Sequence, residues 1–463
     1  MALWRSTVIV SAMTMLSRVL GLVRDIVLLN VFGAGKDFDT FVVAFRIPNF
    51  FRRLFAEGAF SQAFIPVLTE YKTGRTHAEV QILISRVFGC LMTVMTALTF
   101  LAMVAAPAVL YIYAPGFHAD PEKFDLAVSM FRLTIPYLLF MSLTAFASSI
   151  LNSYGSFASP AFSPVLLNVA MIAGAWWLTP YMAEPIMALG WAVIAAGVLQ
   201  LAIQIPELWH KKLLISPKVD FKHEGVDRIM KLMLPALFGV SVTQINLLLN
   251  TIWASFMQDG SVSWLYSAER MTELPLGLIG VAIGTVILPA LSTRHAEQDM
   301  SKFRGMMDWA AKVIVLVGVP ASIALFMLST PIIQALFQRG QFTLEDTQMT
   351  ALALQCMSAG VISFMLIKVF APGFYAQQDT KTPVRVGLMA VAANAILNVV
   401  FIGFFKLIDW QAEHMALALA SSGSALVNAG MLYFYLHKRD IFRFGAHWKK
   451  LFIQFGISNA VMI

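Results

Sequence analysis

Long apolar runs alternate along this chain with short segments that carry most of its charge. Read with a window of about 19 residues, the pattern predicts twelve complete transmembrane helices. Their ranges are 8–32, 40–68, 82–113, 129–152, 158–179, 185–209, 229–257, 264–291, 308–336, 349–375, 383–406 and 413–436. A thirteenth apolar run starts near Trp448 and reaches Ile463, short of the roughly 20 residues that a spanning helix needs. The pattern therefore predicts an incomplete thirteenth span.

Composition agrees with a membrane location. Hydrophobic residues make up 59% of the chain, charged residues only 13%, and the mean hydropathy is +0.74. Soluble domains are near a quarter charged, so a soluble protein is excluded. The sequence predicts an all-α polytopic membrane protein.

The chain also contains an internal duplication. An offset of 224 residues aligns Arg46 with Arg270, and Phe146 with Phe370. Each half holds six predicted spans, an even number, so both halves enter the membrane in the same direction. This arrangement is typical of parallel repeats, related by a pseudo-two-fold axis along the membrane normal. The predicted divisions are an N-lobe at 1–210, a basic cytoplasmic linker at 211–228, a C-lobe at 229–437, and a cytoplasmic loop with the start of the thirteenth span at 438–463.

Loop charge predicts the orientation in the membrane. On the side that holds the amino terminus the loops carry 19 lysines and arginines, and on the opposite side they carry four. Because basic loops stay in the cytoplasm, we expect a cytoplasmic amino terminus. The net charge of +7 is then mainly a topology signal, and the scattered basic loops lack the aromatic interleaving of a nucleic-acid surface.

Six arginines fall inside three of the predicted spans: Arg18, Arg24, Arg46, Arg52, Arg53 and Arg270. Each arginine at the centre of a spanning helix costs about 2.5–3.5 kcal/mol, so six facing lipid would cost ~15–20 kcal/mol. They must therefore face water or an anion. Few carboxylates lie near them, and the sequence predicts a central cationic cavity between the lobes that suits an anionic substrate.

Helical spacing groups the polar side chains of the second span. Arg46, Asn49 and Arg53 recur at i, i+3 and i+7 on one face, and Glu57 and Ser61 continue that row at four-residue steps. Arg53 and Glu57 are spaced to form an ion pair. Repeat symmetry would place Arg46 opposite Arg270 across the axis.

The first and eighth spans carry the other arginines. Arg18 and Asp25 share a face of the first span, whereas Arg24 points about 120° away from Arg18. In the eighth span Glu273 follows Arg270 at i+3 and is placed to orient it. The alternative interpretation is that these charges form interhelical ion pairs that hold the lobes together.

Catalytic chemistry has little support. The eight histidines lie in loops or at span ends without the i, i+4 spacing of a helical metal site, so we expect no metal, no cofactor and no enzymatic activity. Asp39 at the outer mouth of the second span is instead a candidate gate.

Several runs resemble the MurJ (MviN) family of lipid II flippases. They are SRVLG at 17–21 followed by Arg24 and Asp25, AFRIPNFFRRLFAEGAFSQAF at 44–64, GSVSW at 260–264, APGFY at 371–375 and KTP at 381–383. The resemblance covers essentially the whole chain. It implies the two-lobe fold of the multidrug/oligosaccharidyl-lipid/polysaccharide exporter superfamily, and a place in the bacterial inner membrane during cell-wall synthesis. It also maps the family's cavity arginines onto Arg18, Arg24, Arg52 and Arg270, and its other polar positions onto Asp39, Arg53, Glu57 and Glu273.

The expected activity is alternating access, in which the lobes carry the head group of lipid II, an undecaprenyl-diphosphate-linked disaccharide peptide, to the outer leaflet. Arginine suits this substrate because its planar donors bind phosphate in bidentate fashion. Membrane lipids, and cell-wall synthesis proteins, are the other expected partners. Two alternatives stay open at this point: an exporter of another amphiphile or drug, and a non-transporting membrane scaffold for cell-wall enzymes.

Overall fold

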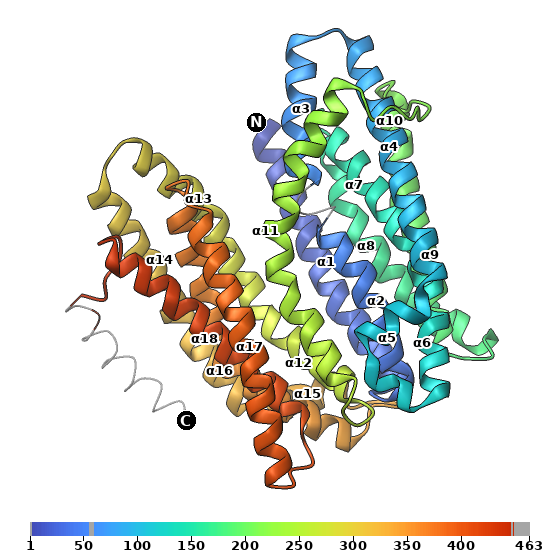
Figure 1. Cartoon of the computed structure of the whole chain (residues 1–463), viewed down its shortest axis with the longest axis vertical. Coiled ribbons are helices and arrows are strands. Elements are labelled where there is room, and N and C mark those ends of the chain that lie inside the picture. The colour runs from blue at the N-terminus through green and yellow to red at the C-terminus, as the bar shows by residue number, and fades with distance from the viewer. Residues whose placement is uncertain (1, 55–59, 446–447, 449–463) are drawn as a thin grey trace. The chain divides into compact units, whose positions relative to one another are not determined.

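The structure is a computed structural model that describes residues 2–54, 60–445 and 448 (Figure 1). All regular elements in this part of the chain are helices, and the described residues include no β-strand. The predicted all-α class is confirmed. By internal contacts the chain forms two units, Met1–Gln244 with Arg339–Phe342, and Ile245–Gln338 with Thr343–Ile463. The domain limits read from the sequence stay a prediction.

The first unit contains ten helices and the start of an eleventh among its described residues. They are α1 (Ala2–Phe32), α2 (Lys36–Leu54), α3 (Phe60–Gly74), α4 (His77–Val104), α5 (Ala106–Tyr113), α6 (Pro121–Thr134), α7 (Tyr137–Ser153), α8 (Ala158–Ala173), α9 (Met187–Ala202), α10 (Ile205–His210) and the first part of α11 (Glu224–Ala254). A π-helical turn, η3 (Gly174–Leu178), extends α8. Short 3₁₀ turns, η2 (Pro115–Ala119) and η4 (Thr179–Tyr181), follow α5 and η3.

The second unit continues with α11 and adds seven α-helices in the described part of the chain. They are α12 (Ser261–Pro275), α13 (Val281–Ala296), α14 (Met300–Met327), α15 (Ser329–Phe337), α16 (Leu344–Tyr375), α17 (Lys381–Leu407) and α18 (His414–Lys438). A π-helical turn, η5 (Leu276–Gly280), joins α12 to α13.

Eight helical stretches of the described residues are long and apolar enough to cross a membrane. They are His77–Val104, Pro121–Ser153, Ala158–Tyr181, Met187–His210, Met300–Met327, Leu344–Tyr375, Lys381–Leu407 and His414–Lys438. Each overlaps a span predicted from the sequence. The other four predicted spans overlap α1, the α2–α3 pair, α11 and the α12–α13 pair. A multi-span membrane fold is therefore confirmed, and the total of twelve spans stays a prediction.

The two units pack their helices in the same order, as an internal duplication predicts. In the first, α2 packs on α6, α3 and α4 pack on α7, and α8 packs on α9. In the second, α12, α13 and α14 pack on α16, and α17 packs on α18. One helix cap recurs as well. The Asp120 side chain accepts from the Lys123 N–H at 3.1 Å, and the Thr343 side chain accepts from the Asp346 N–H, also at 3.1 Å.

Small residues allow the helices of each unit to approach closely. A Cβ added at Gly197 would lie 2.9 Å from the Phe140 Cβ, and one added at Gly360 would lie 2.8 Å from the Ser422 Cα. Helices in lipid associate mainly through such close van der Waals contact, because lipid tails supply no hydrophobic driving force.

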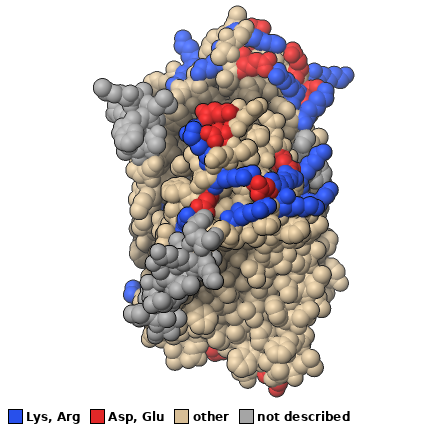
Figure 2. Space-filling model, turned by 90° about the vertical axis from the view of Figure 1, so that its left-hand side faces the viewer, with Lys and Arg blue, Asp and Glu red and all other residues tan. Residues whose placement is uncertain are grey.

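The outer surface is suited to lipid. On the face drawn in Figure 2, Lys, Arg, Asp and Glu gather over the upper part, and uncharged residues cover most of the lower part. Large apolar side chains such as Trp176, Phe404 and Leu407 are exposed. Such exposure is costly in water and favourable against acyl chains.

Candidate functional site

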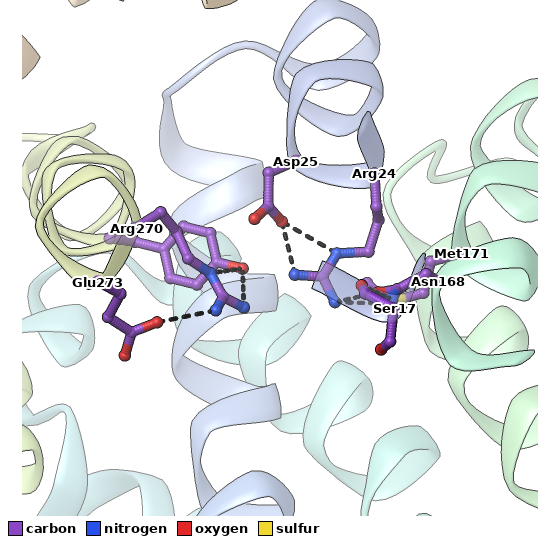
Figure 3. Close-up of polar contacts among 8 residues, drawn as sticks. Ser17, Arg24, Asp25, Asn168, Met171, Arg270 and Glu273 are labelled. Atoms are coloured by element: carbon purple, nitrogen blue, oxygen red, sulfur yellow. Dashed lines mark hydrogen bonds and ion pairs between the residues drawn. The ribbon is translucent and has the colours of Figure 1, made fainter. Parts of the chain in front are cut away.

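The Arg24 guanidinium is buried between α1 and α8 of the first unit (Figure 3). Its Nε and Nη2 donate to Oδ1 of Asp25 at 2.9 and 2.6 Å, and its Nη1 donates to Oδ1 of Asn168 at 3.0 Å. Asn168 Nδ2 donates in turn to the Ser17 carbonyl oxygen at 3.0 Å. Arg24 is 5% exposed and Asp25 3% exposed, so the pair lies in a low-dielectric interior. A buried guanidinium is tolerated there because a carboxylate and an amide oxygen neutralise and solvate it.

This arrangement gives Arg24 and Asp25 a role in joining α1 to α8. The two residues do form an ion pair, but it lies within α1 and not between helices of the two lobes, which was the alternative interpretation of the sequence. Whether Arg24 also binds substrate stays a prediction.

Arg18 occupies a different environment on the same helix. It lies six residues before Arg24 and is exposed. No carboxylate of the described residues pairs with its guanidinium. A charge at such a position needs water or an anion, because lipid would not solvate it.

The polar side chains of α2 include one hydrogen bond that helical spacing did not single out. Arg46, Asn49 and Arg52 are all half-buried. Arg52 Nε donates to Asn49 Oδ1 at 2.9 Å, so Asn49 contacts the residue at i+3 although the spacing grouped it with Arg46 and Arg53. Glu57 and the side chain of Arg53 lie outside the described part of the chain, and their pairing stays a prediction.

Asp39, the candidate gate, is buried in an ion pair near the start of α2. Its Oδ2 lies 3.4 Å from the Lys123 Nζ, with Asp39 1% and Lys123 4% exposed. The Lys123 ammonium also lies 4.1 Å from the centroid of the Phe117 ring. Sequence reasoning counted Lys123 only as a loop charge. The pair Asp120–Pro121 was the available signal, because it is typical of a helix start and places Lys123 in the first turn.

Two further polar contacts lie in the first unit. The Ser61 Oγ, on α3, lies 3.2 Å from the Ser149 Oγ on α7.

Outside the spans, the Lys36 ammonium lies 2.8 Å from the Asp120 carboxylate. Its hydrogen bond holds the pKa of that carboxyl below its usual range.

In the second unit, Arg270 lies on α12 between an aromatic hydroxyl and a carboxylate (Figure 3). Its Nη1 lies 3.1 Å from Glu273 Oε2, as the i+3 spacing predicted. The Tyr266 hydroxyl oxygen lies 3.3 Å from Nε and 3.2 Å from Nη2. The Arg270 side chain is still 31% exposed. Tyr266 was missed in the sequence, although its position four residues before Arg270 puts both on one helix face.

A cluster of buried amides in the second unit was also missed. Asn398 Nδ2 donates to Oδ1 of Asn250 at 3.2 Å and to Oδ1 of Asn394 at 3.1 Å, and Asn250 Nδ2 donates to Ser421 Oγ at 2.8 Å. Asn394 and Asn398 are fully buried. Their i, i+4 spacing in an apolar run was the available signal. Within the described residues, no group of three or more His, Cys, Asp or Glu side chains is arranged to hold a metal ion.

Two similarly packed helical units, with eight described helical stretches long and apolar enough to cross a membrane, define a multi-span membrane protein, and paired repeats of this kind are typical of transporters. The sequence model described as "Lipid II flippase MurJ" matches residues 28–463. A "Probable lipid II flippase MurJ" of Vibrio cholerae is 44% identical over 99% of this chain and 88% of its own length. The chain therefore belongs to the MurJ family, as the sequence motifs implied.

Solved structures support the fold. A structure titled "Lipid II flippase MurJ, inward closed conformation" superposes with a TM-score of 0.80 and 28% identity, covering 94% of this chain and 88% of that one. An inward-facing multidrug resistance MATE transporter of the MOP superfamily gives a TM-score of 0.72 at 12% identity, covering 93% and 98%. The second likeness concerns the fold alone. The family is named for transport, so neither enzymatic activity nor a purely scaffolding role is favoured.

Proposed function

We propose that this chain moves lipid II from the cytoplasmic to the outer leaflet of the bacterial inner membrane. The observation that carries the proposal is the presence of partly or fully exposed guanidinium groups on helices of a MurJ family member. Arg18 has no carboxylate partner among the described residues, and the Arg270 side chain stays 31% exposed beside its ion pair with Glu273. A diphosphate supplies the negative charge that these groups can bind in bidentate fashion.

The arginines divide into two roles in this proposal. Arg18, Arg52 and Arg270 bind the diphosphate, with Asn49 and Glu273 orienting the last two through the contacts at 2.9 and 3.1 Å. Arg24 is committed to Asp25 and Asn168 and positions α1. Arg46 is a further binding residue by its place in the repeat.

Transport proceeds by alternating access of the two lobes, with the head group carried and the polyprenyl tail left in lipid. An inside-negative potential favours this direction, because moving two negative charges outward gains about 4–5 kcal/mol per 100 mV. Asp39, released from Lys123, is the proposed outer gate. Cell-wall synthesis proteins stay predicted partners.

The amino terminus is placed in the cytoplasm on the loop-charge argument. In a chain whose two cysteines are replaced, a single cysteine at Lys36 should react with an impermeant thiol reagent added to intact cells, and one at Lys218 should not. The reverse labelling would reverse the assigned transport direction.

The function itself is tested in cells that depend on this gene after their own flippase is depleted. Labelled lipid II is followed with an impermeant reagent that modifies it only on the outer leaflet. Wild type should keep cells alive and expose lipid II. Arg270→Lys keeps the charge but loses the planar fork, so we expect normal protein level and strongly reduced exposure.

Arg385→Lys is the matched control, because this arginine lies near the start of α17 outside the proposed site. It should leave transport unchanged. Survival without any outward appearance of lipid II would refute flipping. Equal loss in both arginine variants, or loss of folded Arg270→Lys protein, would refute the assigned role of Arg270.

A further inference from the structure

The segment that leads from α10 to α11 is fixed along α4 of the first unit. Gln81 Nε2 donates to the Lys212 carbonyl oxygen at 2.7 Å, and Ser85 Oγ donates to that of Ser216 at 2.7 Å. The Lys218 N–H donates back to the Ser85 carbonyl oxygen at 3.1 Å. These bonds hold residues 211–222, called here the α4 strap, in one path over the helix. The backbone of the strap therefore follows a defined path, from which its side chains project.

Four lysines of the strap have no ionic partner among the described residues: Lys211, Lys212, Lys218 and Lys222. The carboxylates around them are already engaged. Asp220 lies 3.7 Å from Arg86, and Glu224 lies 3.4 Å from Arg75. Glu207 accepts a hydrogen bond from a serine hydroxyl. The surface therefore presents a net positive charge that the protein itself does not neutralise.

Apolar side chains alternate with these lysines and point outward. Trp209 is 70% exposed, Leu214 48%, Val219 56% and Phe221 49%. A strap facing only the cytosol would gain nothing from exposing these groups. Aromatic and aliphatic side chains interleaved with lysine are typical of segments that lie in the headgroup layer of a membrane.

We propose that the α4 strap is a binding surface for anionic phospholipid headgroups, with its lysines on the phosphates and its apolar side chains among the upper acyl chains. Charge complementarity favours this occupant over zwitterionic lipid. The surface lies on the first unit and is separate from the proposed transport residues. Its role is to hold the first unit at a fixed depth in an anionic leaflet. A highly charged soluble partner would use the lysines but would leave the exposed apolar side chains between them in water.

The test uses the full chain in nanodiscs. Both native cysteines, which are buried, are replaced by alanine, and a fluorophore is attached to a single cysteine at the exposed Ser216. Phosphatidylglycerol or phosphatidylcholine with bromines high on the acyl chains is added at equal mole fraction. Each lysine near an anionic surface increases the affinity for anionic lipid by about fivefold. The brominated phosphatidylglycerol should therefore quench the fluorophore severalfold more strongly than the brominated phosphatidylcholine does.

Variants separate charge from depth. Replacing all four lysines by glutamine should make the two lipids quench equally, whereas replacing them by arginine should keep the preference. Phe221→Ser should weaken quenching by both lipids without changing their ratio. Gly89→Ala keeps every lysine but puts a Cβ against the Lys218 backbone, so it should displace the strap and lower the preference.

Equal quenching by the two lipids in the wild type would overturn the proposal, and so would a preference that survives the glutamine variant. In either case the lysines would serve another partner or topology alone. Single glutamine variants, each expected to lose part of the preference, keep the test valid if the fourfold variant fails to fold. These outcomes do not test the proposed transport function, which is measured separately by the appearance of lipid II on the outer leaflet.

Discussion

The pair of Arg24 and Asp25 predicts a large loss of stability when only one partner loses its charge. Asp25→Asn keeps the side-chain shape but removes the counter-charge of a guanidinium that is 5% exposed. Breaking a buried pair costs about 3–5 kcal/mol. The hydrogen bonds from Arg24 Nε and Nη2 go to Asp25, and the bond from Nη1 to Asn168 persists in the variant. We therefore expect the low end of the range, about 3 kcal/mol.

Removing both charges should be less damaging than removing one. In Arg24→Met with Asp25→Asn no buried charge is left unpaired, so most of the lost stability should return. Asn168→Ala removes one hydrogen bond to a charged group and should cost about 1.5–3 kcal/mol. If Arg24 acts only through α1 and α8, the double variant should also retain measurable transport.

Thermal unfolding in detergent measures these effects. Cys90 and Cys356 are both buried, so a maleimide dye that fluoresces on reaction reports their exposure as the chain unfolds. The single variant should unfold several degrees below wild type, with the double variant in between. An Asp25→Asn protein as stable as wild type, or a double variant less stable than Asp25→Asn alone, would refute the claim that Asp25 compensates Arg24.

Two further predictions concern the second unit. Gly360→Ala should destabilise by about 1–3 kcal/mol in the same assay, because its Cβ would lie 2.8 Å from the Ser422 Cα; Gly403→Ala, with nothing within 4 Å, should not. Burial raises the pKa of Asp379, but hydrogen bonds from Thr382 and Arg439 outweigh it and lower this pKa to about 2. This carboxylate therefore contributes stability that is present above its unfolded pKa near 4 and is lost as the pH falls toward 2. Asp379→Asn should flatten that part of the stability profile, and an unchanged profile would contradict the assignment.

The positions of the spans could be predicted from the sequence because the signal is strong. The run at 383–406 corresponds to α17 (Lys381–Leu407), and the run at 413–436 corresponds to α18 (His414–Lys438). In lipid the backbone must satisfy its own hydrogen bonds, so a long apolar run has little choice but a helix.

Breaks inside spans were harder to predict. The run at 82–113 divides into α4 and α5 at Ala105, where both sides are strongly apolar and no polar residue marks the break. A proline at position 107 starts the new helix, and this was the only local signal.

The contacts of the site also divide into those that the sequence predicts and those that it does not. Arg270 and Glu273 lie on one helix, so their ion pair follows from the 3.6-residue period. The bond between Arg24 and Asn168 joins residues 144 positions apart, and it depends on how α1 packs on α8. No period within one helix carries that information. The pairing of Arg24 with Asp25, its immediate neighbour, is also one that side-chain spacing does not favour.

These differences in compensation matter for function because they sort arginines that the sequence presents as equivalent. Each costs about 2.5–3.5 kcal/mol at membrane depth if left in lipid. For Arg24 this cost is offset within the first unit, by Asp25 and Asn168, whether or not substrate is present. For Arg18 no carboxylate of the described residues offsets it, so solvation must come from water or from a ligand. An anionic head group can gain binding energy only from an arginine such as Arg18, whose charge no described carboxylate offsets. Substitution of Arg18 should therefore change transport far more than stability, and substitution of Arg24 should change stability first.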